Sequence, residues 1–410
     1  MEYYQHTLKN GIRIIHKKSE GETSHCGITI NAGSRDELEN EHGLAHLLEH
    51  VIFKGTKKRK AFHILNRIDA VGGEINAFTA KEETCFYASF LNHHFERALE
   101  LLHDITFNSI FPPKEIEKEK DVIIDEINSY LDSPGEQIMD DFEELMLANH
   151  PLGRPILGTD KTVKKLNRHQ IINFTKRQYT SDQIVFSSVG DLEFKKVVAL
   201  CEKYFDEIKP NQLKHNRKKF SNYKPFTKTI NKDTHQAHCV IGNICYHSTH
   251  KKRTEMFLLN NLLGGPAMNS RLNLAIREKY GFTYNLDSSY TPYSDTGLFT
   301  VYLGTDNAYL DRSVELVMKE LKKLQEKKLG TQQLSFAKQQ LLGHIALSQE
   351  SRVNLMIGLG KSVTISNKIE SMEETIKKIN KITSSDLLEI ANEVFNAKKM
   401  STLIFKGKEK

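Results

Sequence analysis

The two halves of this sequence carry the same pattern of residues, and this repeat limits the possible folds more than any other feature. With a shift of 211 positions (257 minus 46), His-Leu-Leu-Glu-His at 46–50 falls on Phe-Leu-Leu-Asn-Asn at 257–261. With a shift of 209 positions (281 minus 72), Gly72 falls on Gly281. A repeat of this kind predicts one structural unit used twice. Because the second copy has lost both histidines and the glutamate, chemistry that needs them is expected in the first half only.

We expect an α+β fold of two duplicated halves, each an antiparallel sheet covered by helices. The chain of 410 residues is also too long for one ordinary domain. Residues 209–228 are polar and basic and lack periodicity, so we predict a linker between domains at 1–208 and 229–410. Apolar spacing predicts helices at 43–54 and 113–131, and Asn10-Gly11 predicts a hairpin with a type I′ turn.

Composition argues against several classes of function. The net charge is only +6, from 58 basic and 52 acidic residues, and the basic residues look dispersed, which speaks against nucleic-acid binding. No run of about 18 apolar residues suggests a membrane span. The first residues resemble neither a signal nor a transit peptide, so we expect a cytoplasmic protein of bacterial type. The five cysteines lack CxxC spacing and are expected to be reduced core residues.

His46, Glu49 and His50 form the motif with the clearest chemical meaning. On a helix, His46 and His50 lie one turn apart on the same face, so both imidazoles can bind one metal ion. Glu49 lies beside that face, where a carboxylate can take a proton from water without being a ligand. H-x-x-E-H is an inverted zinc-peptidase motif. The alternative is a pair of surface histidines beside a structural carboxylate, since three fixed positions also recur by chance.

A hydrolytic zinc site of this kind needs a third protein ligand, commonly a carboxylate. The predicted helix at 113–131 offers several acidic residues. At 100° per residue, Glu115, Glu119 and Glu126 fall on one face of that helix, whereas Glu117 points the opposite way and is expected in solvent. Reasoning from the residues leaves the choice open, because a single Glu in a charged run is more often solvated.

Three stretches of the chain, at residues 43–56, 73–79 and 117–126, resemble the pitrilysin (M16) metallopeptidases. The resemblance covers essentially the whole chain and points to the short bacterial members and to the β subunit of the mitochondrial processing peptidase. In that family the third ligand follows the zinc motif by 76 residues, and 126 minus 50 is 76.

The resemblance implies one Zn²⁺ per chain, bound by His46, His50 and Glu126. It also implies that Glu49 is the catalytic base and that Glu119 supports the site from behind the ligands. Manganese or cobalt stays an open alternative, because two histidines and a glutamate do not fix the metal.

The resemblance assigns substrate contacts to both halves. Asn76 and Ala77 would lie on an edge strand to which a peptide adds as a further strand, a mode that recognises extended backbone. Arg277 would hold a substrate carbonyl, and Tyr284 would stabilise the oxyanion. From the residues alone, Arg277 can equally serve the C-terminal end of its own helix.

Both sets of residues occur on this one chain. In the long members of the family they lie on opposite halves of one clamshell, and short members build that clamshell from two chains. We therefore expect a homodimer whose sites are completed in trans, with a heterodimer formed with an M16 paralogue as the alternative.

The predicted function is that of a zinc metalloendopeptidase, which cleaves unfolded peptides or presequence-like segments inside an enclosed chamber with a metal-activated water. Two other functions are alternatives. A non-catalytic assembly subunit would not need all four of His46, Glu49, His50 and Glu126. A binding module for nucleic acid would need a clustered basic face.

Overall fold

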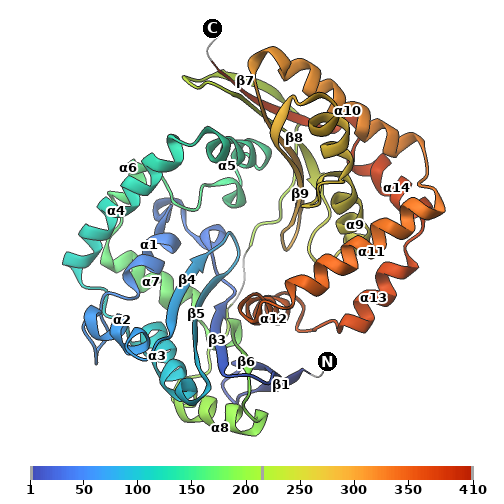
Figure 1. The fold of residues 1–410 in the computed structure, drawn as a ribbon. Helices are drawn as coiled ribbons and strands as arrows, with labels where there is room; N and C mark the ends of the chain where they lie inside the picture. Colours follow the sequence, from blue (N-terminus) through green and yellow to red (C-terminus); the bar gives the residue numbers. More distant parts are fainter. Residues whose placement is uncertain (1–2, 214–216, 408–410) are drawn as a thin grey trace. The chain divides into compact units, whose positions relative to one another are not determined.

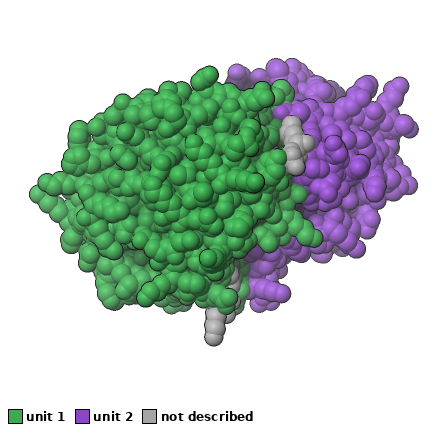
Figure 2. Space-filling view, turned by 90° about the horizontal axis from the view of Figure 1, so that it is seen from below, with its two compact units in different colours: residues 1–128, 154–218, 347–369 green, residues 129–153, 219–346, 370–410 purple. Residues whose placement is uncertain are grey.

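The computed structural model describes residues 3–213 and 217–407. The chain packs into two compact units, drawn in green and purple in Figure 2. Unit 1 comprises Met1–Asn128, Arg154–Lys218 and Leu347–Ile369. Unit 2 comprises Ser129–Gly153, Lys219–Ala346 and Glu370–Lys410. Each unit has its own sheet and its own hydrophobic core.

Unit 1 is built on a six-stranded mixed sheet with the strand order β1-β2-β6-β3-β5-β4 (Figure 1). All neighbouring pairs are antiparallel except β2 and β6, which are parallel. β4 forms a free edge of this sheet. The strands are β1 (Tyr4–Thr7), β2 (Arg13–Lys18), β3 (Thr23–Ile30), β4 (Glu74–Thr79), β5 (Thr84–Leu91) and β6 (Ile184–Gly190).

Different helices cover the two faces of this sheet, as the central strand β6 shows. All seven residues of β6 are buried, and successive side chains point to opposite faces. Ile184 and Phe186 join the large core that contains α1 and α3. Val185 and Val189 instead pack against α12. The helices of unit 1 are α1 (Leu44–Val51), α2 (Ala61–Asp69), α3 (Phe95–Asn108), most of α4 (Pro113–Leu131), α6 (Asp160–Val163), α7 (Arg168–Gln178), α8 (Phe194–Phe205) and α12 (Arg352–Ser366).

Unit 2 is built on a five-stranded sheet with the strand order β7-β11-β8-β10-β9. Here β7 and β11 are parallel, and the other pairs are antiparallel. The strands are β7 (Thr227–Asn231), β8 (Ala237–Cys245), β9 (Thr283–Pro292), β10 (Gly297–Thr305) and β11 (Ser401–Lys406). The helices are α5 (Pro134–Met146), α9 (Arg253–Gly264), α10 (Leu310–Glu326), most of α11 (Thr331–Ser348), α13 (Met372–Lys381) and α14 (Ser384–Val394).

The sheet topology confirms the predicted duplication. The order β2-β6-β3-β5-β4 in unit 1 matches β7-β11-β8-β10-β9 in unit 2, with the parallel pair at one end and a free edge strand at the other. The glycines before the two edge strands also correspond. Gly72 has φ +74° and Gly281 has φ +67°, in the left-handed region that favours glycine.

The expectation of purely antiparallel sheets is wrong for one pair in each unit. In unit 1, β6 is inserted between β2 and β3 and is antiparallel to β3. Because β2 and β3 run in opposite directions, a strand between them must be parallel to one of them. The same insertion of β11 between β7 and β8 makes the parallel pair of unit 2.

Each unit receives one helix from the other half of the sequence. Helix α5 packs on β8 and β11 in unit 2, and α12 packs on β3 and β6 in unit 1. Both helices thus cover corresponding strands of the repeated sheet. Compact packing therefore groups the residues differently from the sequential division at 1–208 and 229–410.

Two smaller features also bear on the sequence predictions. The first hairpin has a longer turn than a type I′ turn, because the last strand pair is Thr7 with Arg13. The five cysteines are free, and four of them are buried, as predicted. Among the described residues, no helix is both long and apolar enough to cross a membrane.

Candidate metal centre and peptidase site

Helix α1 carries the His-x-x-Glu-His motif and is fixed at its start. Gly43 precedes the helix with φ +91°, and the Glu37 carboxylate accepts hydrogen bonds from the N–H groups of Gly43 (3.1 Å) and Ala45 (2.8 Å). These groups would otherwise lack partners at a helix N-terminus. One side of α1 is buried in the core through Leu44, Leu47, Leu48 and Val51. The core thereby sets the rotation of α1 and the direction of its histidines.

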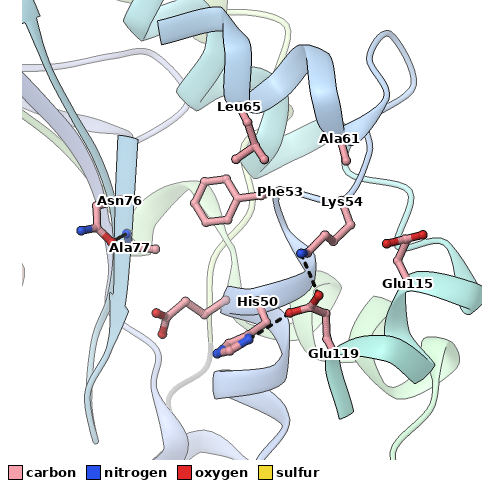
Figure 3. Close-up of a pocket in the computed structure, with 10 residues that line it drawn as sticks. His50, Phe53, Lys54, Ala61, Leu65, Asn76, Ala77, Glu115 and Glu119 are labelled. Carbon is pink, nitrogen blue, oxygen red and sulfur yellow. Dashed lines mark hydrogen bonds and ion pairs between the residues drawn. The ribbon is translucent and has the colours of Figure 1, made fainter. Parts of the chain in front are cut away.

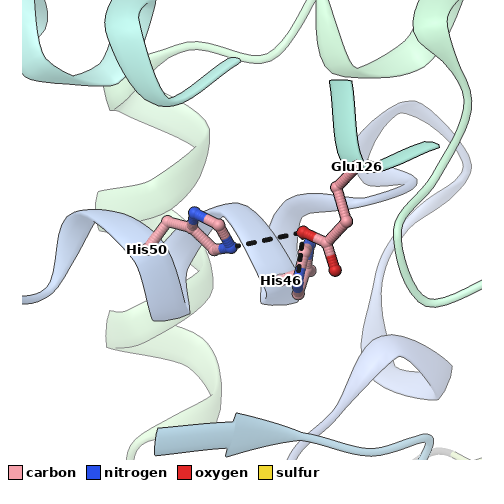
Figure 4. A group of neighbouring side chains, drawn as sticks. All are labelled: His46, His50 and Glu126. Atoms are coloured by element: carbon pink, nitrogen blue, oxygen red, sulfur yellow. Dashed lines mark ion pairs between the residues drawn. The ribbon is translucent and has the colours of Figure 1, made fainter. Parts of the chain in front are cut away.

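His46, His50 and Glu126 of α4 converge on one point, as Figure 4 shows. Glu126 Oε2 lies 3.7 Å from Nε2 of His46 and 3.7 Å from Nε2 of His50. Tetrahedral zinc, with bonds of about 2.0–2.2 Å, places its ligand atoms roughly 3.3–3.6 Å apart. The two separations from Glu126 lie close to this range, and all three donor atoms lie within 4.8 Å of one another, so a small shift of the side chains would bring them to the distances of a zinc site.

The protonation of His46 also fits a metal ligand. Its side chain is buried, and burial together with the neighbouring His50 lowers the pKa of His46 to about 4. At neutral pH the ring is therefore uncharged, with a lone pair available to a cation.

Glu119 lies behind His50 and holds its ring. Glu119 Oε2 is 3.1 Å from Nδ1 of His50, which leaves Nε2 of His50 directed toward Glu126. The other oxygen, Oε1, forms an ion pair with Lys54 Nζ at 2.7 Å. A carboxylate that bonds the far nitrogen of a ligating histidine fixes the tautomer and orientation of the ring.

Lys54 was missed by the sequence analysis, although its spacing carries a signal. It follows His50 by four residues in chain order, which places it near the same side one turn later. Its ammonium group lies beside Glu119 (Figure 3).

Glu49 lines a cavity of about 350 Å³ beside the three converging residues. Burial raises the pKa of the Glu49 carboxyl, and nearby Glu126 acts in the same direction, while Thr79 at the end of β4 lowers it. A carboxylate with a raised pKa is a better proton acceptor near neutral pH. Glu49 is not among the three residues that converge on the common point.

Asn76 and Ala77 line the same cavity from the edge strand β4 (Figure 3). The Ala77 N–H points away from the partner strand β5 and donates to the side-chain oxygen of Asn76 at 2.8 Å. The free edge of the sheet therefore runs along the cavity, and backbone groups of this edge point away from β5.

The remaining acidic residues of α4 have other partners. Glu115 lines the cavity and pairs with Lys118 at 2.9 Å. Glu117 pairs with Lys120 and is largely exposed, as predicted. Of the carboxylates on the predicted face of α4, the structure brings Glu126 to the histidines and Glu119 to the back of His50.

Comparison with known proteins identifies the family. The model of the insulinase family, peptidase family M16, matches residues 13–160, and the model of the peptidase M16 inactive domain matches residues 165–341. The chain belongs to peptidase family M16. The M16 relatives include two proteins named as uncharacterized zinc proteases. YmxG of Bacillus subtilis is 33% identical over 95% of each chain, and one from Streptomyces coelicolor is 33% identical over 98% of this chain and 90% of its own.

Solved structures share the M16 fold over the full length. A peptidase M16 inactive domain from Pseudomonas fluorescens superimposes with a TM-score of 0.93 at 18% identity, covering 100% of this chain and 99% of its own. A protease from Helicobacter pylori superimposes with a TM-score of 0.91 at 22% identity, covering 99% of each chain.

The second unit of this M16 chain keeps the scaffold without the ligand set. Phe257, Asn260 and Asn261 lie on α9, the counterpart of α1. The Asn261 side-chain oxygen is hydrogen-bonded to Nδ1 of His344 on α11, at 3.1 Å. An amide and an imidazole thus join α9 and α11, and the positions that correspond to His46, Glu49 and His50 hold no metal-ligating set.

Arg277 and Tyr284 lie together in unit 2. Arg277 belongs to a π-helical turn at Asn273–Glu278, in place of the regular helix end expected there, and Tyr284 is the second residue of β9. The Arg277 guanidinium lies 4.8 Å from the centre of the Tyr284 ring, and Tyr284 is 78% exposed. A cation over an aromatic face fixes both groups at a surface while leaving the phenol accessible.

Proposed function

We propose that this M16 protein is a zinc metalloendopeptidase that cleaves unfolded peptides or presequence-like segments. The observation that carries the proposal is the convergence of His46, His50 and Glu126 beside Glu49. The names of the zinc-protease relatives add support, since two of them align with nearly the whole chain.

In the proposed mechanism, His46, His50 and Glu126 hold one zinc ion. A bound zinc ion supplies Lewis-acid chemistry, which lowers the pKa of water and polarises a carbonyl. Glu49 accepts the proton from the attacking water and delivers it to the leaving amine. Glu119 and Lys54 keep the His50 ring oriented throughout.

We propose that the substrate lies along β4 as an added antiparallel or parallel strand. The Ala77 N–H now donates a hydrogen bond to the side-chain oxygen of Asn76. Asn76 would release this N–H, so that Ala77 can pair with the peptide backbone. Recognition through backbone groups requires an extended chain, which favours unfolded peptides over folded proteins.

Arg277 and Tyr284 are proposed as the second part of each active site. Arg277 would hold a substrate carbonyl, and the exposed phenol of Tyr284 would stabilise the developing oxyanion. We propose a homodimer that encloses the reaction in a chamber. In this dimer, Arg277 and Tyr284 of one subunit complete the zinc site of the other subunit. A heterodimer with an M16 paralogue is the alternative. We also propose that the protein acts in the cytoplasm, which suits its free cysteines.

Metal removal tests the proposed function. The purified protein is incubated with an unstructured peptide, and the products are identified by mass spectrometry. Internal cleavage should stop after dialysis against a chelator and return on addition of about one equivalent of Zn²⁺, with Mn²⁺ and Co²⁺ compared in parallel. Cleavage that survives complete metal removal would contradict the proposal.

A further inference from the structure

A second cavity of about 590 Å³ adjoins the one that contains Glu49. The two cavities share Lys54, Ala61 and Glu115 in their linings. In Figure 3 these three residues lie on the side of the first cavity that is away from β4. A peptide that leaves β4 beyond the residue whose side chain fills the first cavity therefore has a continuous path into the second cavity.

The wall of the second cavity is the basic loop, which we define as Lys57, Lys58, Arg59 and Lys60 between α1 and α2. From the charge of the whole chain we expected the basic residues to be dispersed. That expectation is wrong at these four consecutive basic residues.

Contacts with α3 hold the basic loop in place. Arg59 pairs with Asp104 at 2.6 Å and with Glu100 at 2.8 Å on α3. The Thr56 hydroxyl donates to Asp104 at 2.8 Å and accepts from the Arg59 N–H at 3.0 Å. These contacts anchor the loop to α3, so a ligand meets a loop whose backbone is already in position.

Only Arg59 of the four cations is neutralised. Lys57, Lys58 and Lys60 are exposed, and in the described part of the chain no carboxylate lies within 4.0 Å of their ammonium groups. The acidic group that lines this cavity, Glu115, pairs with Lys118, and Lys54 pairs with Glu119. The second cavity thus presents three uncompensated positive charges, together with the exposed ring of Phe62.

We propose that the basic loop binds acidic side chains of the substrate, a few residues along the peptide from the one in the first cavity. This inference rests on the proposed peptidase function and narrows its substrates to unfolded peptides with acidic residues, because presequence-like segments are rich in Arg and poor in acidic residues. Segments that carry Asp or Glu on one side of the scissile bond are preferred over uniformly basic ones. Because the loop lies on one side of the first cavity, the preference applies to one side of the cut only.

The test separates binding from cleavage. A fluorescent peptide receives a single Glu at each of several positions on both sides of its central apolar residue, with Gln at the same position as its partner. Binding is measured by anisotropy on the Glu49→Gln protein, so the result does not depend on catalysis. We expect Glu to be bound about 5- to 30-fold more tightly than Gln at one or two positions on one side, as for several partly exposed charge pairs.

Two triple variants test whether the basic loop causes the preference for Glu over Gln. Lys57→Gln, Lys58→Gln and Lys60→Gln together should reduce the Glu-over-Gln ratio to below about twofold. The control, Lys161→Gln, Lys195→Gln and Lys196→Gln, changes the net charge equally at exposed positions outside both cavities and should keep the ratio. Raising the salt concentration should reduce the ratio as well.

Equal binding of Glu and Gln peptides at every position overturns the inference, and so does a preference that survives in the first triple variant. Binding of anionic lipid vesicles without a Glu preference overturns it too. Failure of the wild-type protein to cleave any peptide, with the Glu preference intact, would count against the peptidase function and leave the acidic-ligand site standing.

Discussion

Glu119 and Glu126 lie on the same face of α4 but have different neighbours. Glu126 approaches Nε2 of both histidines, whereas Glu119 contacts the opposite nitrogen of His50 and the Lys54 ammonium. If Glu126 is a ligand and Glu119 a supporting residue, removal of their charges must have different consequences.

We expect Glu126→Gln to lose the metal and Glu119→Gln to weaken its binding by about 10- to 100-fold. The measurement is zinc content after dialysis of each purified variant, followed by titration with a competing chelator. Glu117→Gln is the control, because Glu117 is exposed and pairs with Lys120. Equal zinc retention by the Glu126 and Glu119 variants contradicts the assignment of Glu126.

The pairing of the two histidines was predictable from their spacing, Glu126 was predictable only from the family resemblance, and the environment of all three was not predictable. The i, i+4 relation of His46 and His50 follows from helix geometry, and the family resemblance selected Glu126 from several acidic residues of α4. The ion pair of Lys54 with Glu119 and the carboxylate of Glu37 at the start of α1 depend on tertiary packing. No periodicity in the sequence encodes such contacts.

Helix α12 approaches the sheet of unit 1 closely at one glycine. A Cβ atom on Gly360 would lie 2.5 Å from Thr29 Oγ1 of β3 and 3.1 Å from Ser187 Oγ of β6. Gly358 lies two residues earlier in the same helix, and a Cβ atom added there would meet nothing within 4 Å. The two glycines therefore form a matched pair on one helix.

We expect Gly360→Ala to destabilise unit 1 by about 1–3 kcal/mol, because the added methyl group overpacks the interface between α12 and the sheet. Gly358→Ala should be neutral or stabilising by up to about 1 kcal/mol, since alanine favours a helix over glycine. Thermal unfolding of both variants checks this. A Gly360→Ala protein as stable as the Gly358→Ala protein would mean that α12 does not pack as described.

At the level of helices and strands, local sequence patterns predicted where helices occur better than they predicted which strands the helices pack against. Residues 113–131 were predicted as a helix with the bounds that the structure shows, and the helix predicted at 43–54 ends at Val51. The exchange of α5 and α12 between the units was not predictable, because each helix packs on strands far away in the sequence. The insertion of β6 between β2 and β3 was not predictable for the same reason, because β6 pairs with strands far away in the sequence.

At the scale of the whole molecule, the proposed homodimer predicts complementation between two inactive variants. Glu49→Gln lacks the base, and Arg277→Ala with Tyr284→Phe lacks the opposing pair, so each protein alone should be nearly inactive. In a mixture, some dimers combine an intact zinc half with an intact Arg and Tyr half.

Random exchange of equal amounts gives about half mixed dimers with one good site of two, so activity should approach about a quarter of wild type. Subunit exchange is followed in parallel with differently tagged chains. A mixture that exchanges subunits and stays inactive would show that Arg277 and Tyr284 do not complete the partner's site.

The most direct test of the account compares wild type with Glu49→Gln for zinc content and for cleavage of the same unstructured peptide. Glu39→Gln, an exposed change outside the cavity, is the control. Because Glu49 is the proposed base and not a ligand, Glu49→Gln should keep one zinc per chain and its thermal stability. Its rate should fall at least about 100-fold, as expected for loss of a general base. A zinc-loaded Glu49→Gln protein that cleaves the peptide at the wild-type rate would contradict the account.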